Sequence, residues 1–336
     1  MDMRAVVIVR PGGPDALELR RVAVPEPGAG RIRVRVEAAG LNRADLSQRA
    51  GRYPAPDGWP ADIPGLEYAG IVDALGSGVD DWRPGDRVMG LVGGGAHAEL
   101  VLADAAEAVR IPDRLDSIHA AAVPEIFITA HDALFTQAGL RAGERLLIHA
   151  VGSGVGTAAL QLAKAAGAFV FGTARSAWKL ERAASIGLDR PIDASREDFA
   201  DVIGRETGGA GVDVILDLVG GDYLAANLRS IGSRGRVMLV GLVAGAASTL
   251  DMRLLLRKRV TIRGTVLRSR APDEKAAVAA AFRTHVLPLL EAATIAPVID
   301  RVFPFDEVRA AHAHVQADRS FGKVVLSWAA SRRSRG

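Results

Sequence analysis

The chain of 336 residues is long enough for two domains of ordinary size. Hydrophobic residues make up 49% and charged residues 24%, as is typical of a globular protein. The formal charge of +3 at pH 7 and the lack of a nucleic-acid motif argue against a nucleic-acid partner. The absence of cysteine excludes disulfides, thiol nucleophiles and thiolate metal ligands.

The sequence contains no apolar run of about 18 residues and no recognisable signal peptide. We therefore expect a cytoplasmic protein without a membrane span. The one dense basic stretch, SRRSRG from Ser331 onward, is interpreted as a solvated end rather than a nucleic-acid arm.

Residues 1–125 are expected to be mostly β-structure. Runs such as MRAVVIV, RIRVRVEAAG, YAGIVDAL and DRVMGLV have strand length, and clusters of glycine, proline and aspartate separate them. Many short strands between turns are typical of a barrel-like all-β module.

The pattern changes near residue 126. RLLIHAV at 145–151 indicates a buried strand, and GSGVG separates it from a helix in which Ala158, Leu162 and Ala166 repeat every four residues. A second strand is expected at 168–174, and strand and helix signals alternate to about residue 270. Repeated units of this kind predict an α/β domain, a Rossmann-like doubly wound parallel sheet.

The remaining residues return to mixed structure, with a long helix predicted over 273–293, then a strand, a helix and a final strand at GKVVLSW. We therefore expect one domain from 1–125 and 271–336, a nucleotide-binding domain from 126–270, and a cleft enclosed by the two. The apolar run VTIRGTVL, at the end of the nucleotide-binding domain, predicts an edge strand and hence a homodimer through a continued sheet.

The glycine-rich loop predicts a dinucleotide site. Gly152, Gly154 and Gly156 lie between the strand at 145–151 and the helix after it. Glycine permits close approach of a pyrophosphate, and the helix N-terminus offers free N–H groups. The spacing is GxGxG, with Thr157 where the longer motif has its third glycine.

The end of the second strand favours NADPH over NADH. An NAD site usually has Asp or Glu there, whereas this chain reads GTARSAWK. Arg175 and Lys179 can pair with a 2′-phosphate, and Ser176 can donate a hydrogen bond to it. The alternative is that Arg175 and Lys179 form a solvated helix face.

No metal site is expected from the seven histidines, because none lies in a cluster with ligand spacing. His312 and His314 are two residues apart and would point to different sides of a helix. His149, beside the glycine loop, is expected to be packed or hydrogen-bonded.

Several motifs resemble those of the medium-chain dehydrogenases/reductases. In IPGLEYAG, Leu66 stands between Gly65 and Glu67, where zinc-dependent members have a ligand histidine, and Asn42 stands near the expected ligand cysteine. NRADL, QRAGRYPAPDG and LRSR are similar to the zinc-independent quinone oxidoreductases, most of all to the tumour-suppressor-inducible NADPH quinone oxidoreductase subgroup. The resemblance covers nearly the whole chain. It implies a Rossmann NADPH-binding domain, a GroES-like β-barrel catalytic domain, and zinc-free reduction of quinones.

The resemblance also implies roles for individual residues. Tyr53, Ser153 and Asn42 are expected to donate hydrogen bonds to the acceptor oxygen. Tyr53 could instead be a loop aromatic that closes over the acceptor or have a merely structural role, and Asn42 could brace the loop by bonding its own backbone. No general acid is identified. Asp193 lies where many relatives have a cofactor-touching tyrosine, and an inward acid there would disfavour a 2′-phosphate. The expected cofactor contacts are Thr129, Ser153, Gly154, Val155, Gly156, Arg175, Ser176, Lys179, Gly241, Leu242, Leu267, Arg268, Ser269, Arg270 and Lys323.

Two other functions fit the same sequence. The first is reduction of an enone or enoyl thioester by NADPH, and Arg43, Arg49 and Arg52 could supply the basic rim that a large acyl carrier needs. The second is a non-catalytic NADPH-binding redox sensor. A small-molecule acceptor is the expected partner in either enzyme.

Overall fold

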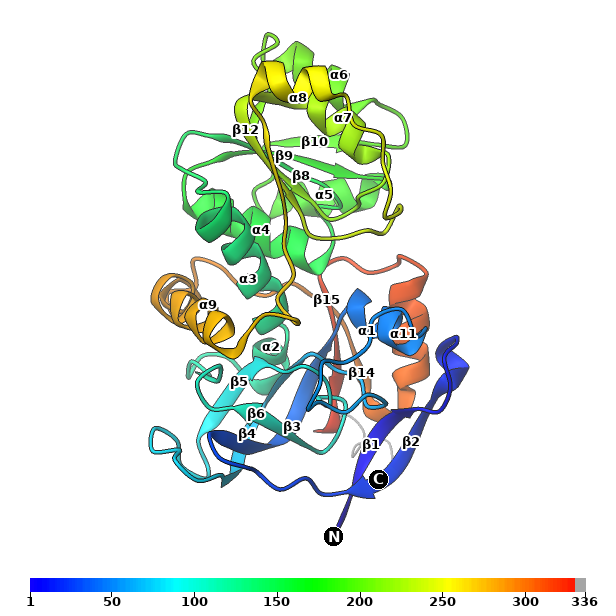
Figure 1. Ribbon diagram of the computed structural model, residues 1–336, viewed down its shortest axis with the longest axis vertical. Helices are drawn as coiled ribbons and strands as arrows, with labels where there is room; N and C mark the ends of the chain where they lie inside the picture. The colour runs from blue at the N-terminus through cyan, green and yellow to red at the C-terminus, as the bar shows by residue number, and fades with distance from the viewer. Residues whose placement is uncertain (330–336) are drawn as a thin grey trace. The chain divides into compact units, whose positions relative to one another are not determined.

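The computed structural model describes residues 1–329, so the basic stretch from Ser331 lies outside the described residues. The chain folds into two compact domains (Figure 1). Domain 1 comprises residues 1–128, 267–293 and 297 onward, and domain 2 comprises residues 129–266 with a short return at 294–296.

The domain boundaries differ by three and four residues from those expected at 125 and 270. The first boundary lies inside α3 (Pro124–His131), a continuous helix with no turn residue to mark it. Residues 294–296 belong to domain 2 because Ala296 is bonded to Gln161 of α4. The side-chain amide of Gln161 donates to the Ala296 carbonyl and accepts from the Ala296 N–H, each at 2.9 Å.

Domain 1 is built around a seven-stranded sheet in the order β14-β15-β3-β4-β5-β7, with β6 also paired to β3, and a separate hairpin of β1 and β2. Alternate residues are buried over 31–38 in β3, as expected for a strand with one face on the core. The strands are β1 (Asp2–Ile8), β2 (Leu17–Ala23), β3 (Arg31–Leu41), β4 (Glu67–Leu75), β5 (Arg87–Leu91), β6 (Leu100–Asp104), β7 (Val109–Arg110), β14 (Ile299–Pro304) and β15 (Lys323–Ser327).

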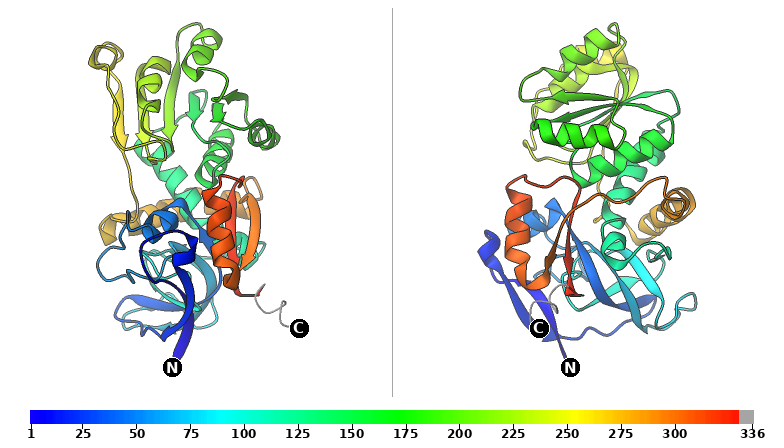
Figure 2. Two further views of the ribbon diagram at one scale, coloured as in Figure 1. Left: turned by 90° about the vertical axis from the view of Figure 1, so that its right-hand side faces the viewer. Right: turned by 180° about the vertical axis from the view of Figure 1, so that it is seen from behind.

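Domain 1 is closed by its C-terminal segment. Strand β15 lies between β14 and β3, antiparallel to β3, and α11 (Val308–Gln316) packs beside β14 and β15 (Figure 2). Phe305 and Trp328 stack in the core with ring centroids 4.1 Å apart. The remaining helices are α1 (Arg43–Arg49), α2 (Ser117–Ala121), α9 (Pro272–His285) and α10 (Leu287–Glu291), with 3-10 turns at Pro14–Ala16 and Phe305–Glu307.

The long helix expected over 273–293 is wrong, because the structure has α9 and α10 with a break at Val286. Pro288 explains the break. Its ring has no N–H to donate and would clash with the carbonyl four residues earlier in a continuous helix, whereas the first turn of a new helix accepts it.

Domain 2 contains the predicted parallel sheet, in the order β10-β9-β8-β11-β12-β13. In chain order this is 3-2-1-4-5-6, so the direction of winding reverses between β8 and β11. The strands are β8 (Arg145–Ile148), β9 (Phe169–Ala174), β10 (Arg190–Asp193), β11 (Val212–Asp217), β12 (Ile231–Leu239) and β13 (Thr261–Gly264).

Helices cover both faces of this sheet (Figure 1). The helices α4 (Gly154–Ala165) and α5 (Ala177–Ser185) lie on one face, while α6 (Phe199–Glu206), α7 (Tyr223–Ser230) and α8 (Met252–Lys258) lie on the other. A π-helical turn at Asp132–Gln137 follows α3. Side-chain caps from Ser153, Asp198 and Asp251 begin α4, α6 and α8. Among the described residues, no helix is long and apolar enough to cross a membrane.

Candidate functional site

The predicted glycine loop lies at the carboxyl end of β8, in domain 2. Ala150 has a φ of 49°, which turns the chain sharply after the strand. A Cβ on Gly156 would lie 2.5 Å from the Ala150 carbonyl oxygen, so only glycine fits where the helix meets the turn. The Ser153 hydroxyl accepts a hydrogen bond of 3.1 Å from the Gly156 N–H.

This geometry fits a dinucleotide pyrophosphate. The N–H groups of Gly154 and Val155 lie in the first turn of a 12-residue helix, where no intrahelical acceptor is available. The loop also lies beside the point between β8 and β11 where the winding reverses, the usual ligand position in such sheets. The Ser153 hydroxyl caps α4, so its role in the protein without a bound cofactor is structural.

The residues expected at a 2′-phosphate follow β9. Arg175 is exposed and Ser176 is the N-cap of α5, without a side-chain capping bond. Lys179 is buried, which argues against the alternative of a wholly solvated face, and its Nζ lies 5.4 Å from the centre of the Trp178 ring. Asp193 ends β10, and its carboxylate accepts hydrogen bonds from the backbone and hydroxyl of Ser195. These bonds lower the pKa of Asp193.

His149 is hydrogen-bonded, as expected. Its ring nitrogens lie 2.9 Å from the Thr173 hydroxyl and 2.7 Å from the Asn227 amide oxygen. Asn227 donates in turn to Asp217, 2.8 Å away, at the end of β11. Burial lowers the pKa of His149, so the ring is neutral. This buried chain of side chains joins the carboxyl ends of β8, β9 and β11 beneath the loop.

Three further predicted contacts belong to domain 2. Gly241 follows β12, and a Cβ there would lie 2.4 Å from the Leu218 carbonyl oxygen. Leu242, next to it, is exposed, whereas Thr129 is buried within α3.

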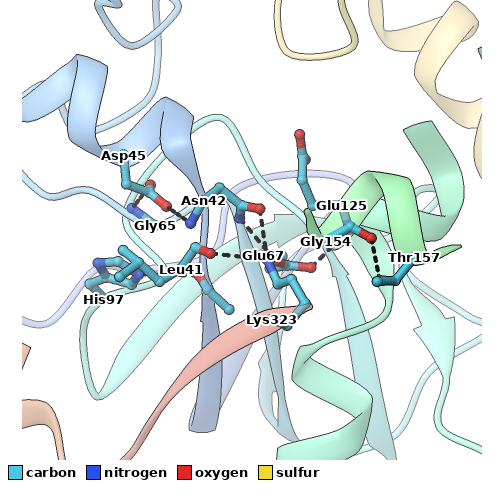
Figure 3. A network of polar contacts seen from close by, with 11 residues as sticks. Leu41, Asn42, Asp45, Gly65, Glu67, His97, Glu125, Gly154, Thr157 and Lys323 are labelled. Atoms are coloured by element: carbon cyan, nitrogen blue, oxygen red, sulfur yellow. Dashed lines mark hydrogen bonds and ion pairs between the residues drawn. The ribbon is translucent and has the colours of Figure 1, made fainter. Parts of the chain in front are cut away.

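In domain 1, Asn42 and Lys323 are brought together by Glu67 (Figure 3). The Lys323 ammonium donates to Glu67 Oε1 at 2.5 Å, to Asn42 Oδ1 at 2.7 Å and to the Leu41 carbonyl at 3.2 Å. Asn42 Nδ2 donates to Glu67 Oε1 at 2.9 Å. Glu67 and Lys323 are 0% and 2% exposed, so this is a fully buried ion pair.

This network gives Asn42 and Lys323 roles that the sequence did not indicate. The three ammonium protons of Lys323 are matched by three protein acceptors. The Asn42 side chain bonds Glu67 and Lys323, and Asn42 is also the N-cap of α1, where its backbone N–H donates to the Asp45 carboxylate. Contact of Lys323 with a cofactor therefore stays a prediction. To make that contact, Lys323 would have to give up at least one of these three hydrogen bonds.

Arg268 and Tyr53 are also brought together in domain 1. The Arg268 guanidinium donates to the carbonyl oxygens of Gly93 and Tyr53 and to the Gln48 side chain, and it lies 4.9 Å from the centre of the Tyr53 ring. Burial raises the pKa of the Tyr53 hydroxyl. Arg268 thus holds the loop around Tyr53, while Leu267 and Arg270 are half-buried and Ser269 is exposed.

A pocket of about 490 Å³, including its open mouth, lies wholly within domain 1. Most of its wall is apolar, and four ionisable side chains interrupt that wall. The lining residues are Leu66, Leu91, Val92, Gly93, Glu107, Glu125, Ile128, Leu267, Arg268, Lys275, Val278 and Ala279.

Two carboxyl groups in this pocket have raised pKa values. Burial raises the pKa of Glu107 to about 7. Burial and the Glu67 carboxylate raise the pKa of Glu125 to about 8. Sequence reasoning missed both. Glu125 stood in the matching stretch VPEIFITAHDALF, but nothing local indicates that its carboxyl faces a pocket.

Among residues 1–329, no group of three or more His, Asp or Glu side chains is placed to hold a metal ion. Arg49 cannot contribute to the basic rim suggested above, because it is buried and bonds His312, Gln316 and the Gly12 carbonyl. That expectation is wrong because the helix α1 turns Arg49 inward.

Comparison with known proteins places this geometry in a family. The family model for the alcohol dehydrogenase GroES-like domain matches residues 28–113, and the one for zinc-binding dehydrogenases matches residues 154–283. The rat synaptic vesicle membrane protein VAT-1 homolog is 35% identical over 342 residues, covering 96% of this chain and 84% of the rat protein. The chain belongs to the medium-chain dehydrogenase/reductase family.

Proteins of several kinds resemble the chain. The polyketide synthase component PikAII of Streptomyces venezuelae is 37% identical over 90% of this chain, although the match spans 8% of that much longer protein. A Pseudomonas syringae quinone oxidoreductase structure has a TM-score of 0.89 at 30% identity, covering 97% of this chain and 100% of its own. The structure of CurK enoyl reductase has a TM-score of 0.86 at 28% identity, covering 97% of this chain and 99% of its own.

Family members with either cofactor share this architecture. The structure of an NAD-dependent alcohol dehydrogenase has a TM-score of 0.85 at 32% identity, covering 97% of this chain and 99% of its own. Mycobacterial Rv1454c, complexed with NADPH, has a TM-score of 0.86 at 28% identity with the same coverage. Family membership thus predicts a nicotinamide cofactor without selecting between the two.

Proposed function

We propose that the chain is a zinc-independent, NADPH-dependent quinone oxidoreductase. The main support is the sequence after β9, where Arg175 and Ser176 stand in place of the acid that would bind the ribose of NAD. The neighbouring strand β8 leads into a glycine loop that fits a pyrophosphate. The similarity to a quinone oxidoreductase and to an NADPH complex supports both parts of the proposal.

The proposed absence of zinc chemistry rests on particular residues. Leu66, between Gly65 and Glu67, has no metal-binding atom, and the chain has no cysteine. Glu67 is paired with Lys323 instead. Polarisation of the acceptor is therefore assigned to hydrogen-bond donors of the protein.

In the mechanism, domain 2 holds the cofactor. The Gly154 and Val155 N–H groups would bind the pyrophosphate, and Arg175 with Ser176 would bind the 2′-phosphate. When bound, NADPH supplies a hydride. In domain 1, the apolar wall formed by Leu66, Leu91 and Val92 would exclude water and accept a flat, uncharged ring.

Negative charge develops on the acceptor oxygen as hydride arrives, so hydrogen-bond donors aimed at that oxygen would accelerate the reaction. The sequence predicts two such donors in domain 1, Tyr53 and Asn42, and Tyr53 is the stronger candidate. Tyr53 is half-buried and its loop is held by Arg268, whereas the Asn42 amide donates to Glu67. Ser153 could assist only by leaving its capping bond to Gly156.

Reduction of an enone or enoyl thioester is the second candidate, supported by the similarity to CurK enoyl reductase and to PikAII. The same pocket and hydride would serve it. Arg49 is buried and Arg43 is paired to Asp318, so only Arg52 is left of the suggested basic rim. The loss of this rim favours small acceptors over a large acyl carrier.

A homodimer and a cytoplasmic location complete the proposal. Strand β13 is the last strand of its sheet, and Val266 just after it is exposed, as are Met252 and Leu256 on α8. An open edge flanked by apolar side chains invites pairing with a second copy. Fractionation of a native cell extract would test the location, because one relative is named as a vesicle membrane protein.

The deciding experiment follows absorbance of NADPH or NADH with a panel of para- and ortho-quinones and small enones. Consumption of NADPH with quinones, strongly preferred over NADH, is the expected result. Turnover of enones alone would replace the proposal with the second candidate. Tight NADPH binding without any acceptor-dependent consumption would overturn both and favour a redox sensor. EDTA-treated protein should retain full activity.

A further inference from the structure

Glu125 is the one pocket carboxyl that borders the buried ion pair of Glu67 and Lys323. It lies in the first turn of α3, and its backbone N–H donates to Glu67 Oε2 at 2.8 Å. The side chain extends away from Glu67, so the anchored backbone and the carboxyl face different directions (Figure 3). The position of Glu125 is therefore fixed by its backbone while the carboxyl lines the pocket.

The Glu125 carboxyl has no protein partner among the residues that the structure describes. Within residues 1–329 it makes no hydrogen bond and no ion pair, although Lys323 and Arg268 lie close enough to influence it. Both cations are committed elsewhere, Lys323 to Glu67 and Arg268 to Gly93 and Gln48. A partly buried polar group without a partner is costly unless a ligand or solvent satisfies it.

Burial is the main reason that the Glu125 carboxyl is neutral, because it raises the pKa of that group. Glu67 on β4 and Asp45 on α1 raise the pKa further, whereas Lys323 on β15 and Arg268 lower it. The value of about 8 leaves the acid mostly protonated at neutral pH. Glu107 and Lys275 line the same pocket but do not contribute to this shift. A neutral carboxylic acid is an O–H donor, whereas a carboxylate can only accept.

We propose that Glu125 is the catalytic proton donor of this pocket, giving its proton to the oxygen of an uncharged conjugated acceptor. The inference rests on the proposed function. Addition of hydride to the acceptor leaves an electron pair on the acceptor oxygen; the O–H bond of Glu125 breaks and a new O–H bond forms there. A quinone gains hydride plus proton and becomes a hydroquinone, while an enone becomes an enol that rearranges to the ketone. Glu125 remains as a carboxylate and regains a proton from water.

The test compares wild type with Glu125→Gln, which keeps the shape but has no proton to transfer. For menadione reduction, wild-type kcat should be constant at low pH and fall above about pH 8, because the acid is then ionised. The variant should lose about 100-fold or more in kcat and lose this alkaline fall, while its Kd for NADPH is unchanged. Glu125→Asp should recover part of the rate. Glu274→Gln, an exposed first-turn glutamate of α9, is the matched control and should behave as wild type.

An alkaline fall that persists in Glu125→Gln with wild-type kcat would overturn the proposal. Infrared difference spectroscopy provides a readout independent of turnover and of the stability of that variant. The wild type should show a protonated carboxyl band that titrates near pH 8 and shifts when menadione is added without NADPH. Glu107→Gln assigns the second band, near pH 7. If no acceptor is reduced, a menadione-dependent shift would still support Glu125 as the donor to a bound carbonyl, and no shift would refute it.

Discussion

The ammonium of Lys323 lies 2.5 Å from Oε1 of Glu67 and joins the first residue of β15 to the first residue of β4. Neither side chain reaches solvent. The contact fixes the place where Asn42, Glu125 and the end of β3 meet, so it supports the candidate site of domain 1 without lining the pocket itself.

Replacing Lys323 by Met should destabilise the protein by about 3–5 kcal/mol, because it leaves the Glu67 carboxylate buried without a counter-charge. The measurement is urea unfolding at pH 7. The double variant Glu67→Gln, Lys323→Met should be more stable than the single one. Lys164→Met, which breaks a partly exposed pair with Asp189, should cost only ~0–1 kcal/mol. An equal loss in Lys323→Met and Lys164→Met would contradict the buried-pair interpretation.

Gly156→Ala should weaken NADPH binding by about tenfold or more, because the new methyl group would meet the Ala150 carbonyl and displace the first turn of α4. Fluorescence titration measures the Kd. Gly204→Ala is the matched control, since a Cβ at Gly204 in α6 meets nothing within 4 Å. That control should keep the wild-type Kd and gain about 0.5–1 kcal/mol in stability.

Arg175→Ala should separate the two nicotinamide cofactors. Loss of a charge-assisted bond of about 1.5–3 kcal/mol to the 2′-phosphate should raise the Kd for NADPH by ten- to a hundredfold, with the Kd for NADH nearly unchanged. Arg182→Ala, in the helix α5 that follows Arg175, serves as the control. A parallel loss of affinity for both cofactors would show that Arg175 acts on the fold of the loop instead.

Stability should decrease as the pH falls below about 6.5, the ordinary pKa of histidine. Burial lowers the pKa values of His97, His149 and His312 in the folded protein, so between the folded and unfolded pKa values only the unfolded chain binds these protons. Each histidine can contribute up to ~1.4 kcal/mol per pH unit to the slope. Unfolding of His149→Gln between pH 7 and 5 should show a shallower slope than wild type; identical slopes would refute its contribution.

Val266→Asp should convert the proposed dimer into a monomer, because it places a charge beside the open edge strand β13. Light scattering coupled to gel filtration measures the mass. Leu19→Asp, at an exposed apolar position of domain 1, should leave the mass unchanged. A monomeric wild-type protein would remove the dimer from the proposal.

Local signals predicted domain 2 better than domain 1. The glycine loop and the alternating strands and helices of the parallel sheet follow from residues close together in the sequence. The contacts of Lys323 with Glu67 and of Arg268 with Gly93 span more than 170 residues, and no periodicity reports them. The neutral state of Glu125 depends first on burial and then on charged groups from four separate segments, so it could not be predicted without the fold.

The position of β15 has a consequence for how the protein is made. This strand, residues 323–327, is inserted between β14 and β3 rather than added at an edge, so the sheet of domain 1 has a gap until it is synthesised. Domain 2 is complete in sequence by residue 296. During synthesis on the ribosome, domain 2 should therefore fold first. Glu67 has no counter-charge until Lys323 is synthesised. Cells lacking chaperone capacity should accumulate nascent chains with a folded second domain and a protease-sensitive first one.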